Sequence, residues 1–240
     1  MTHLAILLAG GKGSRMNNPI KDKLLNPING TNAFRLSYQA FLNSKRVENA
    51  IIVYRDSQQK EMLSREIDLA HKQNNRTFLP IWVKGGLERK DSVSNALINC
   101  PTNCEFVYVH DCARPMIQAN TIDQLEQIVS KVGAVAIARP MSDTIKRISL
   151  LNPINTESPC KTESIDRSSL WIMETPQVSR KDWLLEGIQL ASNKKIQATD
   201  EVSLLELIGK KVSLLTPPYP NPKLTSVADL PYFKFLIPKK

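Results

Sequence analysis

Short apolar runs recur along this chain, separated by longer segments in which apolar residues recur every three or four positions. The runs are rich in β-branched residues, which is typical of buried strands, and they fall at residues 4–9, 50–54, 78–83, 106–109, 132–138 and 212–215. Helical spacing or composition occurs at residues 58–73, 91–99, 121–131, 183–190, 201–208 and 227–235. This alternation predicts an α/β fold: a mostly parallel sheet, joined by right-handed crossovers, with helices on both faces.

The alternation breaks down between residues 139 and 170, where no long apolar periodicity remains. The middle of this segment, residues 152–164, is polar and contains two prolines. A surface loop is one interpretation, but structureless loops of this length are uncommon inside a compact domain and are often functional. We therefore predict one domain over residues 1–240, with a protruding arm at residues 141–170.

Composition narrows the class of protein. The 240 residues suffice for one domain with a core of ordinary size. No apolar stretch is long enough for a transmembrane helix, and the first strand begins too early to leave room for a leader, so we expect a cytoplasmic protein. The four cysteines show no metal-binding or disulfide spacing. The net charge of +9 suits phosphorylated ligands, whereas scattered basic residues and 6% aromatics make a nucleic-acid surface the weaker alternative.

Glycine is scarce in this chain and is concentrated at two places. Only nine of the 240 residues are glycine. Gly10, Gly11 and Gly13 directly follow the first predicted strand, and Gly85 and Gly86 form a pair after another strand. Glycine allows the backbone conformations and the close approach with which several N–H groups can surround one anion. The two loops therefore indicate a phosphate site, with a tight turn that holds no ligand as the alternative.

Neither of the two common glycine-rich nucleotide motifs is present. A P-loop needs G-x-x-x-x-G-K-[ST], but Arg15 stands at the sixth position counted from Gly10. The dinucleotide fingerprint G-x-G-x-x-G needs a third glycine where the chain has Met16. Arg15 and Lys23 follow the loop, and their charges favour an anion over an empty turn.

Four polar segments follow predicted strands, at residues 9–23, 85–92, 110–115 and 139–146. Ligands of open α/β sheets bind outside the carboxyl ends of the strands, so we expect these segments to meet at one crevice. Asp111 ends one of the strands, and one carboxylate with substrate phosphates is a suitable ligand set for Mg²⁺. A helix cap or a turn is the structural alternative for Asp111.

The motifs GGKGSRM, GGLERKDSV, HDCARP, DTIK, TPQ, TDE and NPKLT occur in this order. As an ordered set they resemble the 2-C-methyl-D-erythritol 4-phosphate cytidylyltransferase family, from residue 4 to about residue 235. The resemblance implies a Rossmann-like nucleotidyltransferase fold, CTP as donor, a sugar-alcohol phosphate as acceptor and Mg²⁺. It also implies a homodimer formed through the arm, and a place in non-mevalonate isoprenoid precursor synthesis.

The resemblance further implies roles for individual residues. Arg15, Lys23 and Lys223 would be catalytic, with Lys21 as the second candidate for the role of Lys23, and Asp111 would hold the metal ion. Nucleotide binding would involve Ala9, Gly10, Gly11, Gly13, Gly86, Arg89, Ser92 and Asp111. The acceptor would be held by Arg114, Thr144 and Arg167.

Three further residues in these motifs have more than one interpretation. His110 could serve as a general base, but the acceptor phosphate is already anionic, so we expect a structural role for this histidine. Asp200 in the TDE motif is either the N-cap of a helix or a residue that orients a lysine. The sequence leaves open whether Cys112, beside Asp111, is reactive.

Two other functions remain compatible with the sequence. The first is a sibling cytidylyltransferase that acts on ribitol 5-phosphate or another polyol phosphate. The second is a protein that keeps the fold without activity and binds a nucleotide or a nucleic acid. The joint presence of Arg15, Lys23, Asp111 and Lys223 argues against the second.

Overall fold

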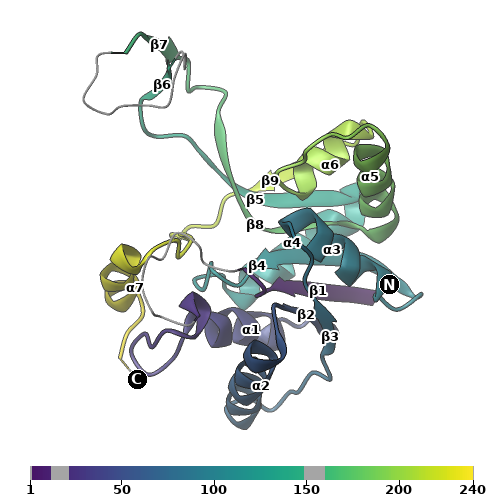
Figure 1. Cartoon of the computed structure of the whole chain (residues 1–240), viewed down its shortest axis with the longest axis vertical. Coiled ribbons are helices and arrows are strands. Elements are labelled where there is room, and N and C mark those ends of the chain that lie inside the picture. The colour runs from purple at the N-terminus through teal and green to yellow at the C-terminus, as the bar shows by residue number, and fades with distance from the viewer. Residues whose placement is uncertain (1, 12–21, 149–159, 240) are drawn as a thin grey trace.

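A seven-stranded, mostly parallel sheet forms the centre of the protein. The computed structural model describes residues 2–11, 22–148 and 160–239. The strands are arranged in the order β3-β2-β1-β4-β8-β5-β9, and only β8 runs antiparallel to its neighbours (Figure 1). Their bounds are β1 (Thr2–Leu8), β2 (Asn49–Tyr54), β3 (Ile81–Lys84), β4 (Cys104–Asp111), β5 (Ala134–Pro140), β8 (Trp171–Arg180) and β9 (Ser213–Leu215). The predicted α/β class is confirmed.

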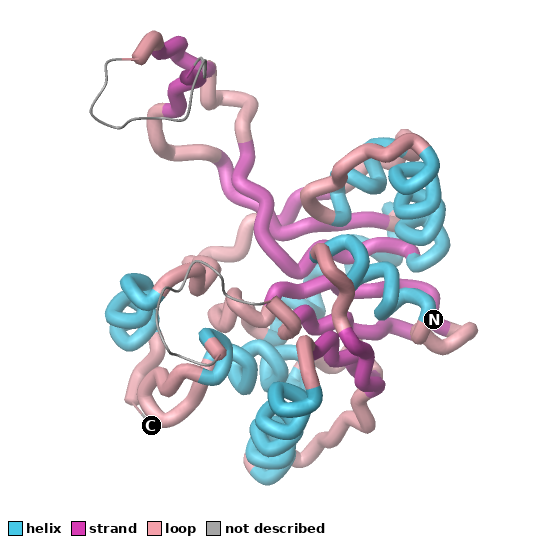
Figure 2. Tube along the Cα trace, in the orientation of Figure 1, coloured by secondary structure: helices cyan, strands magenta, loops and turns pink. Residues whose placement is uncertain are grey.

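Helices cover both faces of the sheet, as predicted (Figure 2). One face packs against α1 (Ala33–Asn43), α2 (Ser57–Lys72), α4 (Ala119–Val132) and α7 (Leu230–Leu236). The other packs against α3 (Arg89–Ile98), α5 (Lys181–Asn193) and α6 (Glu201–Leu207). Each face of the sheet has its own hydrophobic core, and successive side chains of β1 point into the two cores in turn. Ala5 and Leu7 pack into the first core, and Leu4 and Ile6 pack into the second. No helix of the described residues combines the length and the apolarity that a membrane span requires.

Several element boundaries differ from the predicted ones for local reasons. The strand expected at residues 132–138 starts at Ala134, because Gly133 takes a left-handed conformation and ends α4. The strand expected at residues 78–83 starts at Ile81, and Phe78 is buried ahead of it. The helix expected at residues 227–235 is a short 3-10 turn, η2 (Val227–Asp229), followed by α7. A further 3-10 turn, η1 (Lys23–Leu25), precedes α1.

A separate ribbon projects from the body of the protein. Strands β6 (Ile145–Ile148) and β7 (Thr162–Ile165) pair antiparallel and form a sheet of their own. Figures 1 and 2 show this ribbon standing away from the helices, on two connections that leave β5 and enter β8. It lies within the predicted arm at residues 141–170, and its part in dimer formation stays a prediction.

His110 belongs to the core beneath the carboxyl end of β4. Its ring is fully buried, lies 5.3 Å from the ring of Phe41, and its Nδ1 shares a hydrogen bond of 3.1 Å with the hydroxyl of Thr175. Burial lowers the pKa of His110 to about 3. A ring that stays neutral and enclosed in this way supports the structural role expected for it.

We expect His110 to make the protein less stable as the pH falls. The unfolded chain takes up a proton on this histidine below pH 6.5, whereas the folded protein does so only near pH 3, so acid favours unfolding. Between about pH 6 and pH 4, the wild-type free energy of unfolding should fall by up to ~1.4 kcal/mol per pH unit more than that of His110→Gln. Urea unfolding at several pH values measures this difference; equal pH slopes would contradict it.

Candidate active site

The candidate site lies where the order of the strands changes direction. From β1 the chain moves to β2 and β3 on one side, while β4 lies on the other side, so a crevice opens at the carboxyl ends of β1 and β4. A cavity of about 690 Å³ occupies this place. The predicted residues that line it are Ala9, Gly10, Gly11, Lys23, Gly86, Arg89, Ser92, Asp111 and Lys223.

The two glycine loops meet at the end of β2. The N–H of Ala9 donates to the carbonyl of Val53 at 2.9 Å, and the N–H of Gly85 donates to the carbonyl of Tyr54 at 2.8 Å. A Cβ on Gly10 would stand 3.3 Å from the carbonyl carbon of Tyr54, which is tighter than ordinary contact. The absence of side chains therefore lets both backbone segments lie against β2 and border the same cavity.

The second glycine loop is held in shape by its own polar groups. The hydroxyl of Ser92 accepts from the N–H of Gly86 at 3.0 Å and donates to the carbonyl of Glu88 at 3.2 Å. Asp91 accepts from the N–H of Glu88 and completes a capping box at the start of α3. A Cβ on Gly86 would overlap Asp91, so this position requires glycine.

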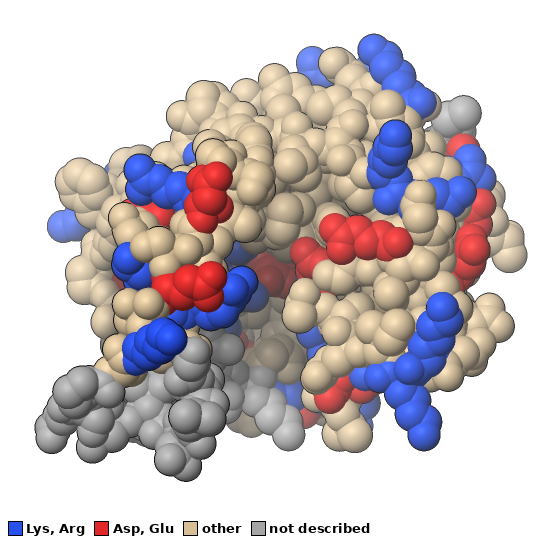
Figure 3. Space-filling view, turned by 90° about the horizontal axis from the view of Figure 1, so that it is seen from above, with Lys and Arg blue, Asp and Glu red and all other residues tan. Residues whose placement is uncertain are grey.

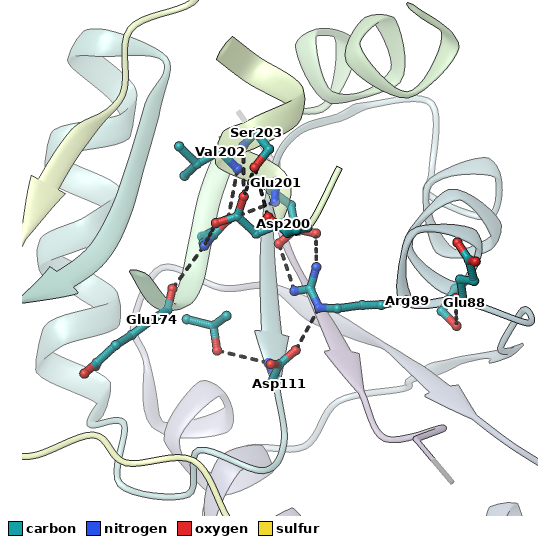
Figure 4. A network of polar contacts seen from close by, with 12 residues as sticks. Glu88, Arg89, Asp111, Glu174, Asp200, Glu201, Val202 and Ser203 are labelled. Atoms are coloured by element: carbon teal, nitrogen blue, oxygen red, sulfur yellow. Dashed lines mark hydrogen bonds and ion pairs between the residues drawn. The ribbon is translucent and has the colours of Figure 1, made fainter. Parts of the chain in front are cut away.

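Asp111 is held between two cations. Nε of Arg89 donates to one carboxylate oxygen at 3.1 Å, and Nζ of Lys223 donates to the other at 2.6 Å. Arg89 also donates through both terminal nitrogens to the two oxygens of Glu201, at 2.6 and 2.9 Å. Figure 4 shows Arg89 reaching from α3 to a point between Asp111 and Glu201. Arg89 therefore forms a bidentate ion pair with Glu201 and contacts the carboxylate of Asp111 through its third nitrogen.

These contacts decide the protonation states at the site. Burial would raise the pKa of Asp111, but the charges of Arg89 and Lys223 hold it well below its usual range. Burial would lower the pKa of the Arg89 guanidinium, yet Glu201 and Asp111 raise it. Burial also raises the pKa of Glu201, and Arg89 opposes this rise. Asp111 is thus an ionised carboxylate at neutral pH, and Arg89 is a guanidinium enclosed by acidic groups.

The start of α6 holds Glu201 in place beside Arg89. Asp200 accepts from the N–H of Ser203 at 2.9 Å, so the interpretation of this residue as a helix N-cap is confirmed. The amide of Gln177, on β8, donates to Asp200 at 2.9 Å and accepts from the N–H groups of Glu201 and Val202. Gln177 therefore ties the TPQ motif to the TDE motif and sets the position from which Glu201 meets Arg89.

Glu201 and Gln177 are site residues that the sequence alone does not reveal. Both stand inside motifs that were noticed, TDE and TPQ, but Glu201 lies 112 positions from Arg89 and Gln177 lies 24 positions from Glu201. The one available signal was the charge of Glu201 directly after a helix cap. Only the packing of α6 on the sheet converts that charge into a buried partner for Arg89.

The three predicted acceptor residues lie outside the cavity. Arg114 donates to the carbonyls of Asn221, at 2.8 Å, and Met173, at 3.5 Å, and its buried Nε has no partner among the described residues. Thr144 is exposed where β6 begins, and Arg167 donates to the carbonyl of Ser142. Thr144 and Arg167 thus lie at the base of the ribbon, apart from the glycine loops.

Three predicted residues cannot be placed. Gly13, Arg15 and the alternative lysine Lys21 lie outside the described residues. Lys23 is described and borders the cavity. The structure therefore supports a position for Lys23 near the site, and the choice between Lys21 and Lys23 stays open.

Known proteins resemble this chain over its whole length. A family model described as 2-C-methyl-D-erythritol 4-phosphate cytidylyltransferase matches residues 3–239. A protein of that name from Clostridium perfringens is 31% identical over 230 residues, which cover 95% of each chain. The chloroplastic protein of that name from Oryza sativa subsp. japonica is 30% identical over 226 residues, which cover 94% of this chain and 71% of the relative.

Solved structures share the fold at lower sequence identity. The crystal structure of 4-diphosphocytidyl-2C-methyl-D-erythritol synthase from Anaerococcus prevotii has a TM-score of 0.80 at 19% identity and covers 98% of this chain and 95% of its own. That of the Francisella tularensis 2-C-methyl-D-erythritol 4-phosphate cytidylyltransferase has a TM-score of 0.75 at 21% identity, with coverage of 99% and 100%. The family match and the shared fold lead to one conclusion: this chain belongs to the 2-C-methyl-D-erythritol 4-phosphate cytidylyltransferase family.

Proposed function

We propose that this protein transfers CMP from CTP to 2-C-methyl-D-erythritol 4-phosphate, a step of non-mevalonate isoprenoid precursor synthesis. The observation that carries the proposal is the cavity at the carboxyl ends of β1 and β4, bordered by the two glycine loops, three lysines and the Asp111 carboxylate. Membership of the family supports both the donor and the acceptor. We place the reaction in the cytoplasm.

The residues suit an in-line displacement at phosphorus. An oxygen of the acceptor phosphate forms a new bond to the α-phosphorus of CTP, and the bond from that phosphorus to the bridging oxygen breaks. Pyrophosphate leaves with the bonding electron pair, so no protein nucleophile and no base are needed. The protein must place the two phosphates and stabilise the charge that develops between them.

We assign that stabilisation to backbone N–H groups and fixed cations. Gly10 and Gly11 border the cavity, and their backbone N–H groups would donate to the triphosphate in our proposal. Ala9 and Gly86 shape the same pocket, with N–H groups that already donate to Val53 and Ser92. Lys23 and Lys223 bring ammonium groups from distant parts of the chain to the same cavity. Arg15 and Gly13 complete the set in our proposal, and Ser92 takes part by holding the second loop closed around the nucleotide.

The site suits Mg²⁺ only together with the substrate. Among the described residues no cluster of three or more His, Cys, Asp or Glu side chains could hold a metal. Asp111 supplies one ionised carboxylate that borders the cavity, and Mg²⁺ commonly takes one or two carboxylates with substrate phosphates. When bound there, the ion would neutralise phosphate charge. We propose Asp111 as its protein ligand.

Arg89 has a different part from the one its motif indicates. Its guanidinium faces the carboxylates of Asp111 and Glu201, which match its charge before any nucleotide arrives. We propose that Arg89 contributes to nucleotide binding through Asp111, by holding this carboxylate in place, rather than as a cation for the triphosphate.

We propose that the acceptor site is completed by a second copy of the chain. Thr144 and Arg167 stand at the base of the projecting ribbon and do not border the cavity of their own chain. Trp171 and Ile172 there expose 44% and 41% of their surface, which favours burial against a partner. Arg114, Thr144 and Arg167 would then hold the acceptor, with the arm crossing to the other subunit in a homodimer.

The charge distribution gives little support to nucleic-acid binding. On the face seen in Figure 3, Lys and Arg side chains are interspersed with Asp and Glu and form no continuous basic stripe. A polyol phosphate other than methylerythritol 4-phosphate is the more serious rival, because it would use the same fold and the same CTP loops.

The proposal predicts pyrophosphate release that depends on CTP, the acceptor and Mg²⁺. Purified protein should turn over 2-C-methyl-D-erythritol 4-phosphate with a kcat/KM at least about tenfold above that for ribitol 5-phosphate. EDTA should stop the reaction and added Mg²⁺ should restore it. Faster turnover of ribitol 5-phosphate would show that a different polyol phosphate is the acceptor. No pyrophosphate release with either acceptor, together with tight RNA binding, would overturn the proposed function.

Removal of the catalytic lysine should lower turnover strongly. We expect Lys23→Ala to reduce kcat by about 100-fold or more, the usual effect of losing one preorganised charge donor. Lys72→Ala, at the exposed end of α2, is the matched control and should match the wild type. If Lys21→Ala is severe while Lys23→Ala is mild, the catalytic lysine is Lys21.

A shared acceptor site predicts that two inactive variants rescue one another. Lys223→Met impairs the nucleotide cavity and Arg167→Ala impairs the arm, so each should be inactive alone. When they are mixed and allowed to exchange subunits, about a quarter of wild-type activity should return, since half of the dimers are mixed and one of their two sites is intact. Absence of rescue, or an active monomer after removal of residues 145–165, would show that each chain holds its own acceptor site.

A further inference from the structure

A buried glutamine near the cavity connects two segments of the chain: the start of the first glycine loop at Ala9, and Asp22, which precedes Lys23. Gln59 stands in the first turn of α2 and is fully buried. Its amide nitrogen donates to the carbonyl of Ala9 at 2.9 Å and to the carboxylate of Asp22 at 2.5 Å. Its amide oxygen accepts from the N–H of Arg55 at 2.6 Å. Every polar group of this side chain is therefore used.

The two residues that Gln59 holds are neighbours of the proposed phosphate-binding groups. Ala9 directly precedes Gly10 and Gly11, and its own N–H is already held by Val53. The Gln59 contact holds the other side of this residue, at its carbonyl. The backbone that enters the glycine loop is thereby held from two directions at the end of β1.

Asp22 holds the second segment in the same way. Its carboxylate accepts from the N–H of Leu24 at 2.9 Å and so caps the 3-10 turn η1, which begins at Lys23. The other carboxylate oxygen takes the Gln59 amide and a weaker contact of 3.3 Å from Arg55. The side chain of Asp22 is only 2% exposed, so a partner is required for its charge.

Gln59 itself does not border the cavity, whereas Ala9, Gly10, Gly11 and Lys23 do. Any effect on a ligand must therefore act through the segments that it joins. A methionine or leucine of similar volume would fill the same space, but it would leave a buried carbonyl and a buried carboxylate without a donor. Packing alone does not explain an amide at this place.

We infer that Gln59 is a positioning residue for the triphosphate of CTP. By donating to Ala9 and to Asp22 at once, its amide sets the separation between the glycine backbone and Lys23 on the two sides of the cavity. The inference rests on the proposed use of CTP. It concerns the donor nucleotide alone, because the described contacts of Arg114 and Arg167 lead to other parts of the chain and not to this cluster.

The sharpest test replaces the amide nitrogen of Gln59, which donates to Ala9 and Asp22, with an oxygen. Gln59→Glu keeps the shape and the acceptor for Arg55, but it turns an oxygen towards both Ala9 and Asp22. We expect kcat/KM for CTP to fall roughly 30-fold, mainly through KM, while KM for the acceptor stays within about twofold. Adding Asp22→Asn supplies a new amide donor opposite the introduced carboxylate and should recover about tenfold.

Controls separate positioning from loss of the fold. Gln58→Glu makes the same charge change one residue away, on an exposed part of α2, and should match the wild type. Gln59→Met removes the donor without adding charge, so it serves as the test if Gln59→Glu does not fold, and it should raise KM for CTP about tenfold. Lower thermal stability with an unchanged KM for CTP in folded Gln59 variants would show that the residue is only structural.

A binding-independent measurement distinguishes this inference from the proposed function. Amide hydrogen exchange at Ala9 and Leu24, whose N–H groups are hydrogen-bonded, should be at least about tenfold faster in both Gln59 variants than in Gln58→Glu. If the wild type fails to turn over CTP, the proposed function and this nucleotide role both fall. If it does turn over CTP and the Gln59 variants match Gln58→Glu in exchange and KM, only the inference on Gln59 is overturned.

Discussion

The ionised carboxylate of Asp111 is the constraint around which the site is organised. It stands at the end of a buried strand, where burial works against its charge, and two cations compensate for that cost. One cation comes from α3 and the other from the segment that precedes α7, 112 positions after Asp111 in the chain. A single acidic group thus brings together elements that are far apart in the sequence.

Strand β8, which runs antiparallel to both of its neighbours, carries the residues that support this centre. On β8, Thr175 accepts from the backbone N–H of Asp111 and shares a hydrogen bond with His110, while Gln177 holds the start of α6. From there Glu201 fixes Arg89. The described contacts of the TPQ motif are therefore structural. They link β4, which ends in Asp111, to α6, which carries Glu201.

Much of the fold could be predicted from periodicity, and the exceptions have physical causes. Strands β1, β2 and β4 are continuous apolar runs because both faces of the sheet are covered. Strand β8 was not predicted, since Glu174, Thr175, Gln177 and Ser179 are polar yet buried, and hydrogen bonds from other elements satisfy them. Helix α1 was also missed, although Asn32 caps it by accepting from the N–H of Arg35.

Local patterns in the chain are enough to predict the class of fold, the two glycine loops and Asp111 at a strand end, because each depends on residues that are close together in the chain. Which groups face one another follows only from the packing of the elements: Glu201 lies against Arg89, Lys223 against Asp111, and Gln59 between Ala9 and Asp22. A buried polar group forms its hydrogen bonds with whichever partner this packing brings within reach. That partner can stand anywhere in the chain, so no local pattern records it.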